Sequence, residues 1–398
     1  MDSALVLNAG SSSLKFCVYR GEDPTSWHLD ARGQIDGIGT APKFVAKDPS
    51  GARVDARQLD AAAVRDGHGA LSDLAAWLRS RYSGGRVRGV GHRVVHGGAR
   101  FTGPTRVTPD VLDEIRKLIP LAPLHQPYNL AAIEAVAGQL PDVPQVACFD
   151  TSFHRGQPAV AEIVALPRDI CAAGVQRYGF HGLSYEYVAS VLPSVAPAIA
   201  EGRVIVAHLG SGASLCAMKQ RRSVDSTLGF TALDGLCMGT RPGTTDPGVI
   251  LYLFQSLGLS AKEVEAILYK KSGLLGISGI SNDMRDLIEN PAPSARLAVD
   301  YFVYRAAREI GGLASVLGGL DALVFTAGIG ENSPEIRRRI CEASAWLGVD
   351  LDQDANRAGG PLISRPQSAV SAWVIPTNEE LVIARHTGRL LGLVEARA

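Results

Sequence analysis

Five segments of the sequence place ionisable side chains beside glycines, prolines or the ends of apolar runs. They are residues 91–98, 124–127, 148–151, 178–182 and 238–242, and they include Arg93, His125, Asp150, His181 and Arg241. A single residue of this kind would usually be a satisfied core group or a surface charge, but packing does not require five of them. Cationic side chains, imidazoles and a carboxylate suit the transfer of a phosphoryl group, in which catalysis consists mainly of charge stabilisation and alignment.

Three glycine-containing turns could hold the phosphates of such a substrate. Residues 10–13 precede Lys15 and contain one glycine and three serines, while residues 210–212 and 328–330 each follow an apolar strand. Glycine lets backbone N–H groups approach an anion closely, and hydroxyls and Lys15 add donors and charge. No Gly-Lys dipeptide occurs, which excludes a Walker A loop. The alternative for residues 10–13 is a β-hairpin whose serine-rich turn binds nothing.

Magnesium is expected because the oxygens of a transferring phosphoryl group need neutralising. Asn8, Asp150 and Glu379 are the strand-end oxygens that could bind it, directly or through water. The six cysteines are scattered without a Cys-x-x-Cys pair, so we expect reduced core thiols rather than a zinc site or a disulfide framework.

The composition indicates a small-molecule partner. Forty basic and forty acidic residues cancel, which gives no reason to expect nucleic acid or an anionic membrane surface. The N-terminus lacks the pattern of a signal peptide, and no uncharged stretch reaches the ~18 apolar residues of a membrane span. We therefore expect a cytoplasmic protein, and its 398 residues suffice for two domains.

Strands and helices alternate in the segments that must position these residues. We expect a meander of short strands within residues 20–60, and further strands at 87–95, 145–149, 322–326 and 370–375. Helices are expected at 70–78, at 295–317 and from 380 onward. Helix caps are expected at Thr108, at Ser260 with Glu263 (for a helix through Tyr269), and at Ser333. A strand, a Gly/Ser turn and a second strand occur at residues 5–16 and again at 204–216, which suggests an internal duplication.

The same pattern divides the chain into two α/β domains. We expect an N-terminal domain of residues 1–149, joined by a C-terminal helix at 380–398, and a C-terminal domain of residues 150–379 that binds nucleotide. A ligand is expected at the strand ends between them.

Five motifs occur along the chain in order: residues 8–15, Phe180-His181-Gly182, His208-Leu209-Gly210, Met238-Gly239-Thr240-Arg241 and residues 328–332. Together they closely resemble the acetokinase family over essentially the whole chain. The resemblance implies an α/β, duplicated actin/hexokinase/Hsp70-like (ribonuclease H-like) fold with an interdomain active-site cleft. It also implies a homodimer with its interface in the C-terminal domain, and reversible, Mg²⁺-dependent (Mn²⁺ is possible) transfer of the γ-phosphoryl group of ATP to acetate, giving acetyl phosphate and ADP.

The resemblance further implies roles for individual residues. Asp150 matches the catalytic carboxylate, Arg93 and Arg241 match the pair that holds the carboxylate and the transferring phosphoryl group, His181 matches a transition-state stabiliser and His125 a further active-site histidine. Asn8 and Glu379 match the magnesium positions, and Val95, Leu124, Phe180 and Ala232 line the acyl pocket. The nucleotide positions are Lys15, His208, Leu209, Gly210, Ser211, Gly212, Asp283, Met284, Arg285, Gly328, Ile329, Gly330, Glu331 and Asn332.

This sequence departs from the family pattern at four places. Ser211 stands where the family usually has Asn, Leu183-Ser184-Tyr185 where it has Thr-Ser-His, Pro242 where it has Cys, and Ala232 where a proline is common. None of these changes removes a charged catalytic group, so the reaction class is retained. Phosphate affinity and acyl preference are the properties that these changes bear on.

Two alternatives remain at this point. The first is a propionate kinase on the same scaffold. The second, from another class, is an ATP-driven conformational switch of the Hsp70 or actin kind. A switch protein would need a dedicated partner-binding segment, and we expect none because the chain ends at Ala398 directly after the terminal helix.

Overall fold

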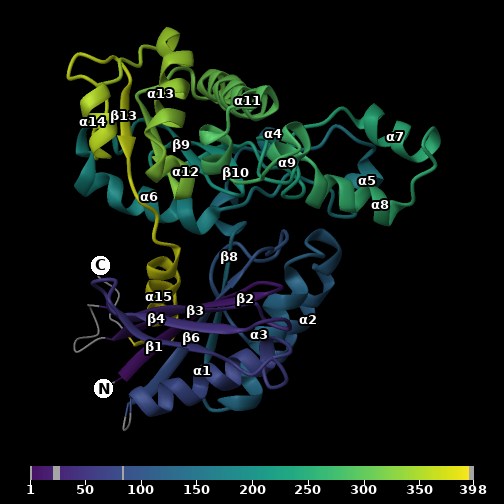
Figure 1. Ribbon diagram of the computed structural model, residues 1–398, viewed down its shortest axis with the longest axis vertical. Coiled ribbons are helices and arrows are strands. Elements are labelled where there is room, and N and C mark those ends of the chain that lie inside the picture. Colours follow the sequence, from purple (N-terminus) through teal and green to yellow (C-terminus); the bar gives the residue numbers. More distant parts are fainter. Residues whose placement is uncertain (1, 21–26, 83–84, 394–398) are drawn as a thin grey trace. The chain divides into compact units, whose positions relative to one another are not determined.

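The computed structural model describes residues 2–20, 27–82 and 85–393, which divide into two compact units (Figure 1). Unit 1 comprises residues 1–152 and 378–398, and unit 2 comprises residues 153–377. The expected boundaries put Asp150 and Glu379 in the C-terminal domain, whereas both lie in unit 1. The reason is local: the backbone N–H of Asp150 donates to the carbonyl of Val94, and Thr151 Oγ1 accepts from the N–H of Gly97 at 3.0 Å.

Unit 1 is built on an eight-stranded sheet with the order β5-β4-β3-β2-β1-β6-β8-β7. The strands are β1 (Asp2–Ala9), β2 (Ser13–Arg20), β3 (His28–Asp36), β4 (Lys43–Lys47), β5 (Arg53–Gln58), β6 (Arg86–Val94), β7 (Thr105–Arg106) and β8 (Gln145–Phe149). Strands β1 to β5 pair in an antiparallel meander, as predicted, and β1, β6 and β8 run parallel. Residues 21–26 of the predicted meander, and 394–398 of the predicted C-terminal helix, lie outside the described residues.

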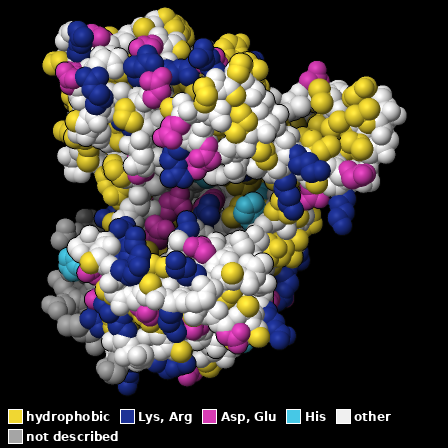
Figure 2. Space-filling view, in the orientation of Figure 1, with side chains coloured by type: hydrophobic (Ala, Val, Ile, Leu, Met, Phe, Trp, Pro, Cys, Tyr) yellow, Lys and Arg dark blue, Asp and Glu magenta, His cyan; other side chains and the backbone are white. Residues whose placement is uncertain are grey.

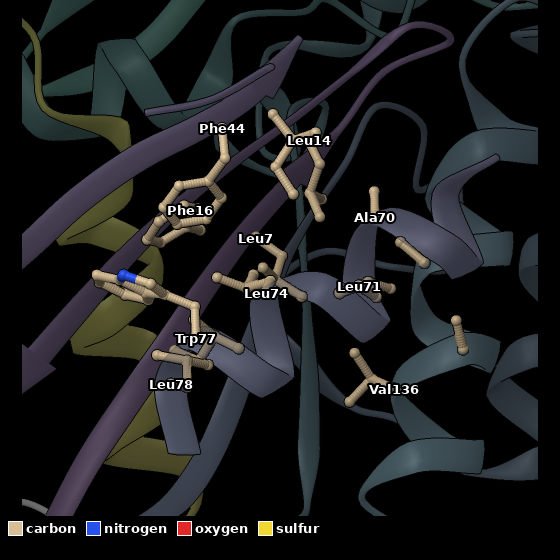
Figure 3. Packing of buried hydrophobic residues seen from close by; sticks show 14 of the residues in the cluster. Leu7, Leu14, Phe16, Phe44, Ala70, Leu71, Leu74, Trp77, Leu78 and Val136 are labelled. Atoms are coloured by element: carbon tan, nitrogen blue, oxygen red, sulfur yellow. The ribbon is translucent and has the colours of Figure 1, made fainter. Parts of the chain in front are cut away.

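The helices of unit 1 are α1 (Gly67–Arg81), α2 (Pro109–Lys117), α3 (Gln126–Gln139) and α15 (Glu379–Leu390). Figure 3 shows Phe16 and Phe44 of the sheet packed against Trp77 of α1; the centroids of these three rings lie 5.4–5.6 Å apart. Val90 of β6 joins this core. On the opposite face of β6, a Cβ at Gly91 would lie 2.3 Å from Thr387 Oγ1 of α15. A glycine is required there because α15 approaches the strand so closely, and this contact fixes the position of the helix that begins at Glu379.

Unit 2 contains a five-stranded sheet with the order β11-β10-β9-β12-β13. Its strands are β9 (Arg203–Leu209), β10 (Ala213–Lys219), β11 (Arg222–Ser226), β12 (Ala322–Thr326) and β13 (Ser371–Val374). Three antiparallel strands are followed by two parallel ones, which repeats the β3-β2-β1-β6-β8 part of unit 1. Gly10 and Gly210 occupy the same hairpin turn in the two sheets, so the internal duplication is confirmed.

The remaining helices belong to unit 2. They are α4 (Ala159–Glu162), α5 (Arg168–Ala172), α6 (Gly182–Val195), α7 (Pro247–Gln255), α8 (Ala261–Ala266), α9 (Gly273–Ser278), α10 (Met284–Glu289), α11 (Pro293–Leu317), α12 (Ala327–Asn332), α13 (Pro334–Ala343) and α14 (Gln353–Ala358). The predicted caps at Thr108, Ser260 with Glu263, and Ser333 are confirmed. The helix predicted through Tyr269 ends at Ala266 and continues as a π-helical turn over Ile267–Lys271.

The predicted glycine turn at residues 328–332 is instead the short helix α12. Asn332 Nδ2 donates to the carbonyl of Gly328 at 2.9 Å, and Glu331 Oε1 accepts from the N–H of Ala327 at 2.8 Å, which closes the helical turn. All six cysteines are free thiols, and five of them are buried. A search of the described residues for a helix long and apolar enough to cross a membrane finds none.

Candidate active site

Unit 1 gathers four of the predicted residues at one edge of its sheet. Asn8 lies near the end of β1, Arg93 near the end of β6, Asp150 directly after β8, and Glu379 begins α15. Because β1, β6 and β8 are parallel neighbours, their carboxyl ends meet at the same edge. The parallel register therefore brings together side chains that the sequence separates by up to several hundred residues.

Arg93 is the centre of this cluster. Its Nε lies 3.1 Å from Asp150 Oδ1 and its Nη2 lies 2.5 Å from Asp150 Oδ2, which is a bidentate ion pair. Nη1 donates to Asn8 Oδ1 at 3.4 Å, and Nε lies 3.6 Å from Glu379 Oε2. Bidentate pairing holds the planar guanidinium in one orientation.

The carboxylates of Asp150 and Glu379 both pair with Arg93, and the pKa of each is raised. The pKa of Glu379 is raised to about 7: burial is the largest cause and the charges of Asp150 and Glu380 add to it, while Arg93 and Lys15 oppose the shift. Burial also raises the pKa of Asp150, against the attraction of Arg93. A cluster that holds more carboxylate than cation favours an additional cation.

Three more predicted residues of unit 1 lie on the loop after β6 and at the start of α3. Val95 is buried, and its N–H donates to Asn129 Oδ1 at 3.0 Å. Leu124 is half-buried, and the exposed His125 occupies the N-cap position of α3. Asn129 Nδ2 also donates to the carbonyl of Ala9 at 3.0 Å, so this buried amide fastens the end of β1 to the loop after β6. No sequence motif indicates this role of Asn129, which lies four residues after His125 on α3.

Unit 2 brings His181 and Arg241 to the glycine turn after β9. A Cβ at Gly212 would lie 2.9 Å from Arg241 Nη2 and 3.3 Å from His181 Nε2, so both nitrogens face the space that glycine leaves open. Arg241 Nη1 donates to the carbonyl of Ala232 at 2.7 Å, and burial lowers the pKa of Arg241. His181 has φ 57° in the left-handed region, which costs a non-glycine residue about 1–3 kcal/mol and is typical of functional sites.

His181 also stacks on His208, with the ring centroids 4.1 Å apart and an interplanar angle of 17°. Its neighbour Phe180 is buried, and the carbonyl of Phe180 lies 2.9 Å from His154 Nε2. The two donors facing Gly212 can stabilise negative charge that develops at one point.

The same turn also lines a cavity of about 460 Å³. All three predicted nucleotide segments contribute to its lining, which consists of Gly210, Ser211, Asn282, Asp283, Met284, Arg285, Ile288, Gly328, Ile329, Asn332 and Ser333. This volume falls within the range of small-molecule sites. Asn282, Ile288 and Ser333 are lining residues that the sequence motifs do not indicate, although each lies within a few residues of a predicted segment.

Other predicted nucleotide residues do not line this cavity. Leu209 is fully buried in the sheet, and the carbonyl of Gly330 accepts from Arg337 Nη1 at 2.9 Å. Glu331 Oε1 accepts the N–H groups of Ala327 and Thr377, at 2.8 and 3.0 Å, so it joins α12 to the strand end after β13. His208 and Gly212 face His181 instead, and Lys15 belongs to unit 1.

An arginine and a histidine that converge beside a nucleotide-sized cavity, on a duplicated pair of mixed α/β sheets, indicate a phosphotransferase. The sequence profile of the acetokinase family matches residues 3–385. The chain is 55% identical over 394 residues to an acetate kinase of Rhodopseudomonas palustris, covering 98% of both sequences. We conclude that the chain belongs to the acetokinase family.

Solved structures agree with this assignment. The crystal structure of Porphyromonas gingivalis acetate kinase matches with a TM-score of 0.86 at 36% identity, covering 97% of this chain and 99% of that one. A propionate kinase from Francisella tularensis matches with a TM-score of 0.90, at the same identity and coverage. The predicted family, the actin/hexokinase-like fold and the enzyme class, a phosphotransferase with a carboxyl group as acceptor, are confirmed. The alternative of a switch protein is set aside.

Proposed function

We propose that this enzyme transfers the γ-phosphoryl group of ATP to acetate, giving acetyl phosphate and ADP, and catalyses the reverse reaction. One observation carries the proposal: the Arg241 and His181 nitrogens face one open point at Gly212, and Gly210 and Ser211 of the same turn line the nucleotide-sized cavity. In the forward direction a carboxylate oxygen of acetate forms the new bond to γ-phosphorus, and the bond from γ-phosphorus to the bridging oxygen of ADP breaks.

Unit 2 supplies the nucleotide site and the stabilisation of the transferring group. The backbone of residues 210–211 and 328–329 and the side chain of Asn332 are available to the nucleotide. Arg241 and the Nε2 of His181 would donate to the phosphoryl oxygens as the charge moves. Burial strengthens both interactions, because the local dielectric constant is low.

Unit 1 supplies the groups that orient the acceptor. We assign Arg93 to the carboxylate of acetate, Asp150 to the anchoring of Arg93 and of the acceptor, and His125 to a further contact. Arg93 is suited to this role because Asp150 already fixes its orientation, so less side-chain entropy is lost when the substrate binds.

Asn8 and Glu379 fit a magnesium ion. Mg²⁺ is usually held by one or two carboxylates together with substrate phosphates and water, rather than by an all-protein cage. Among the described residues, no group of three or more His, Cys, Asp or Glu side chains could hold a metal by itself. When bound, the ion supplies neutralisation of the phosphoryl oxygens, and Mn²⁺ would suit the same oxygens.

The acyl preference is assigned to four apolar residues. Val95 and Leu124 belong to unit 1, and Phe180 and Ala232 belong to unit 2. The branched Val95 favours the short chain of acetate, whereas Ala232, which stands where a proline is common, leaves more room. Propionate kinase is therefore the second candidate, and the similarity to the F. tularensis propionate kinase supports keeping it.

We further propose a homodimer formed through an apolar surface of unit 2. Figure 2 shows hydrophobic side chains gathered over the part of unit 2 that carries α5, α7 and α8 in Figure 1. Its exposed apolar side chains are Val160, Ile163, Leu166, Ile170, Val249, Leu251, Tyr252, Phe254 and Leu257. Leu251→Lys with Tyr252→Glu should convert a species of twice the 42.0 kDa chain mass into monomer in light scattering, and Val316→Lys, at an exposed site on α11, should not. A cytoplasmic location would agree with ATP as substrate.

Trapping of the acyl phosphate tests the function. Purified enzyme with ATP, magnesium and hydroxylamine should form hydroxamate in proportion to added acetate. Parallel rates with propionate and butyrate decide between the two candidates. ATP hydrolysis at a rate that no added acid changes, with no hydroxamate formed, would contradict both candidate functions.

A further inference from the structure

Each of the two stacked histidines of unit 2 forms a hydrogen bond with a serine hydroxyl. His181 Nδ1 lies 2.8 Å from Ser214 Oγ, and His208 Nδ1 lies 2.8 Å from Ser184 Oγ. The first of these contacts continues: Tyr185 Oη lies 2.5 Å from Ser214 Oγ. A chain of hydrogen bonds therefore runs from Tyr185 on α6, through Ser214 on β10, to the ring of His181.

The direction of the protons in this chain follows from burial. Tyr185 is fully buried, and burial raises its pKa well above the ordinary value, so the phenol keeps its proton. A buried hydroxyl needs an acceptor, and Ser214 Oγ lies at hydrogen-bond distance. Once Ser214 Oγ accepts from Tyr185, its own single proton is directed at His181 Nδ1. Nδ1 must then accept, and the proton of the neutral ring sits on Nε2.

Nε2 is the atom of His181 that faces Gly212 alongside Arg241. The titratable or charged groups of unit 2 that face His181 include His208 through stacking, Arg241 across Gly212, and Tyr185 through Ser214, with Cys216 next to Tyr185. A second cation beside Arg241 would be repelled, which also favours the neutral ring.

We propose that Tyr185 is a positioning residue which, through Ser214, holds His181 as the Nε2–H tautomer, so that a neutral imidazole donates toward the transferring group. The identity of the transferring group rests on the proposed function, whereas the tautomer itself does not. Tyr185 stands where the family usually has a histidine. A histidine there could change its own charge near neutral pH, whereas a buried tyrosine cannot, so this chain keeps the same direction of donation across that range.

Tyr185→Phe tests the proposal, because it removes a single oxygen and keeps the volume of the ring. Without the phenol, Ser214 can accept from Nδ1–H, and the Nδ1–H tautomer of His181, which turns a lone pair toward Gly212, becomes populated. We expect kcat at pH 8.5 to fall by about threefold to tenfold, less than the ~10²-fold loss when a donor is deleted outright, with KM for acetate and ATP within about twofold.

Tyr187→Phe, on the same helix, is the matched control and should change neither quantity. The direct measurement is the ¹⁵N spectrum of the His181 ring in the substrate-free enzyme, assigned by loss of its signals in His181→Gln. The expected wild-type spectrum has Nδ1 unprotonated and Nε2 protonated near pH 7.5, with a shift toward the other tautomer in Tyr185→Phe. A wild-type ring protonated at Nδ1, or a tautomer ratio unchanged in the variant, overturns the proposal.

The spectrum needs no substrate and no variant of Tyr185, so the wild type alone can refute the inference if Tyr185→Phe fails to fold. An enzyme that forms no acyl phosphate but has the expected spectrum would refute the proposed function alone. An active enzyme whose Tyr185→Phe variant loses kcat while the tautomer ratio of His181 stays that of the wild type would make Tyr185 a packing residue.

Discussion

Gly212→Ala adds one methyl group at the point where Arg241 and His181 converge. The new Cβ would lie 2.9 Å from Arg241 Nη2 and 3.3 Å from His181 Nε2, whereas ordinary contacts begin near 3.4 Å. The guanidinium must therefore retreat by about half an ångström. A displacement of 1 Å in a catalytic constellation can cost about 10²-fold in rate, so half of that distance should lower kcat by about tenfold.

The fold should tolerate this change. Gly212 does not have a φ in the left-handed region, and the atoms that a Cβ would meet belong to the ends of side chains rather than to the backbone. The melting temperature should therefore stay within about 2 °C, which corresponds to less than ~2 kcal/mol in a chain of this size. Rates of hydroxamate formation at saturating acetate and ATP measure kcat.

Gly312→Ala is the matched control. Gly312 lies on α11, and a Cβ there would meet no atom within 4 Å, so kcat should not change. If Gly212→Ala retained at least half of the wild-type kcat with the fold intact, the donors would not act at this point and the reasoning would fail.

Three further predictions concern Arg241, the acyl pocket and two buried histidines. Arg241→Leu should lower turnover by about 10³-fold or more while the fold persists, and a variant with near-normal turnover would remove Arg241 from the mechanism. Val95→Ala should raise kcat/KM for propionate relative to acetate, from a wild-type preference for acetate of about tenfold, and an unchanged ratio would refute the pocket assignment. Burial lowers the pKa of His92 and His154 to about 4. Between pH 6.5 and 4 the unfolded chain therefore binds more protons than the folded protein, so the free energy of unfolding falls as the pH falls through that window. In urea unfolding from pH 7.0 to 5.5, His154→Gln should lose about 1.4 kcal/mol less stability than the wild type, and an equal loss would show that His154 does not titrate there.

The sequence by itself determined the features that depend on neighbours along the chain. Strands at 145–149 and 322–326 match the structure residue for residue, because short apolar runs bounded by turn residues are a local signal. The caps at Thr108 and Ser333 are equally local, since a side-chain oxygen needs only the N–H groups two or three residues ahead. The duplicated hairpins and the ordered motifs sufficed for the family and its reaction class.

Tertiary structure alone decided which side chains meet. Nothing local to Arg93 indicates that Asp150, Asn8 and Glu379 surround it, because parallel pairing and the approach of α15 to Gly91 create that cluster. Glu331 accepts the N–H of Thr377, a contact between residues 46 positions apart that no local pattern indicates. The direction of the His181 proton depends on a tyrosine and a serine from different elements. Hydrogen bonds and ion pairs act over a few ångströms, and only the folded chain brings groups so far apart in sequence within that range.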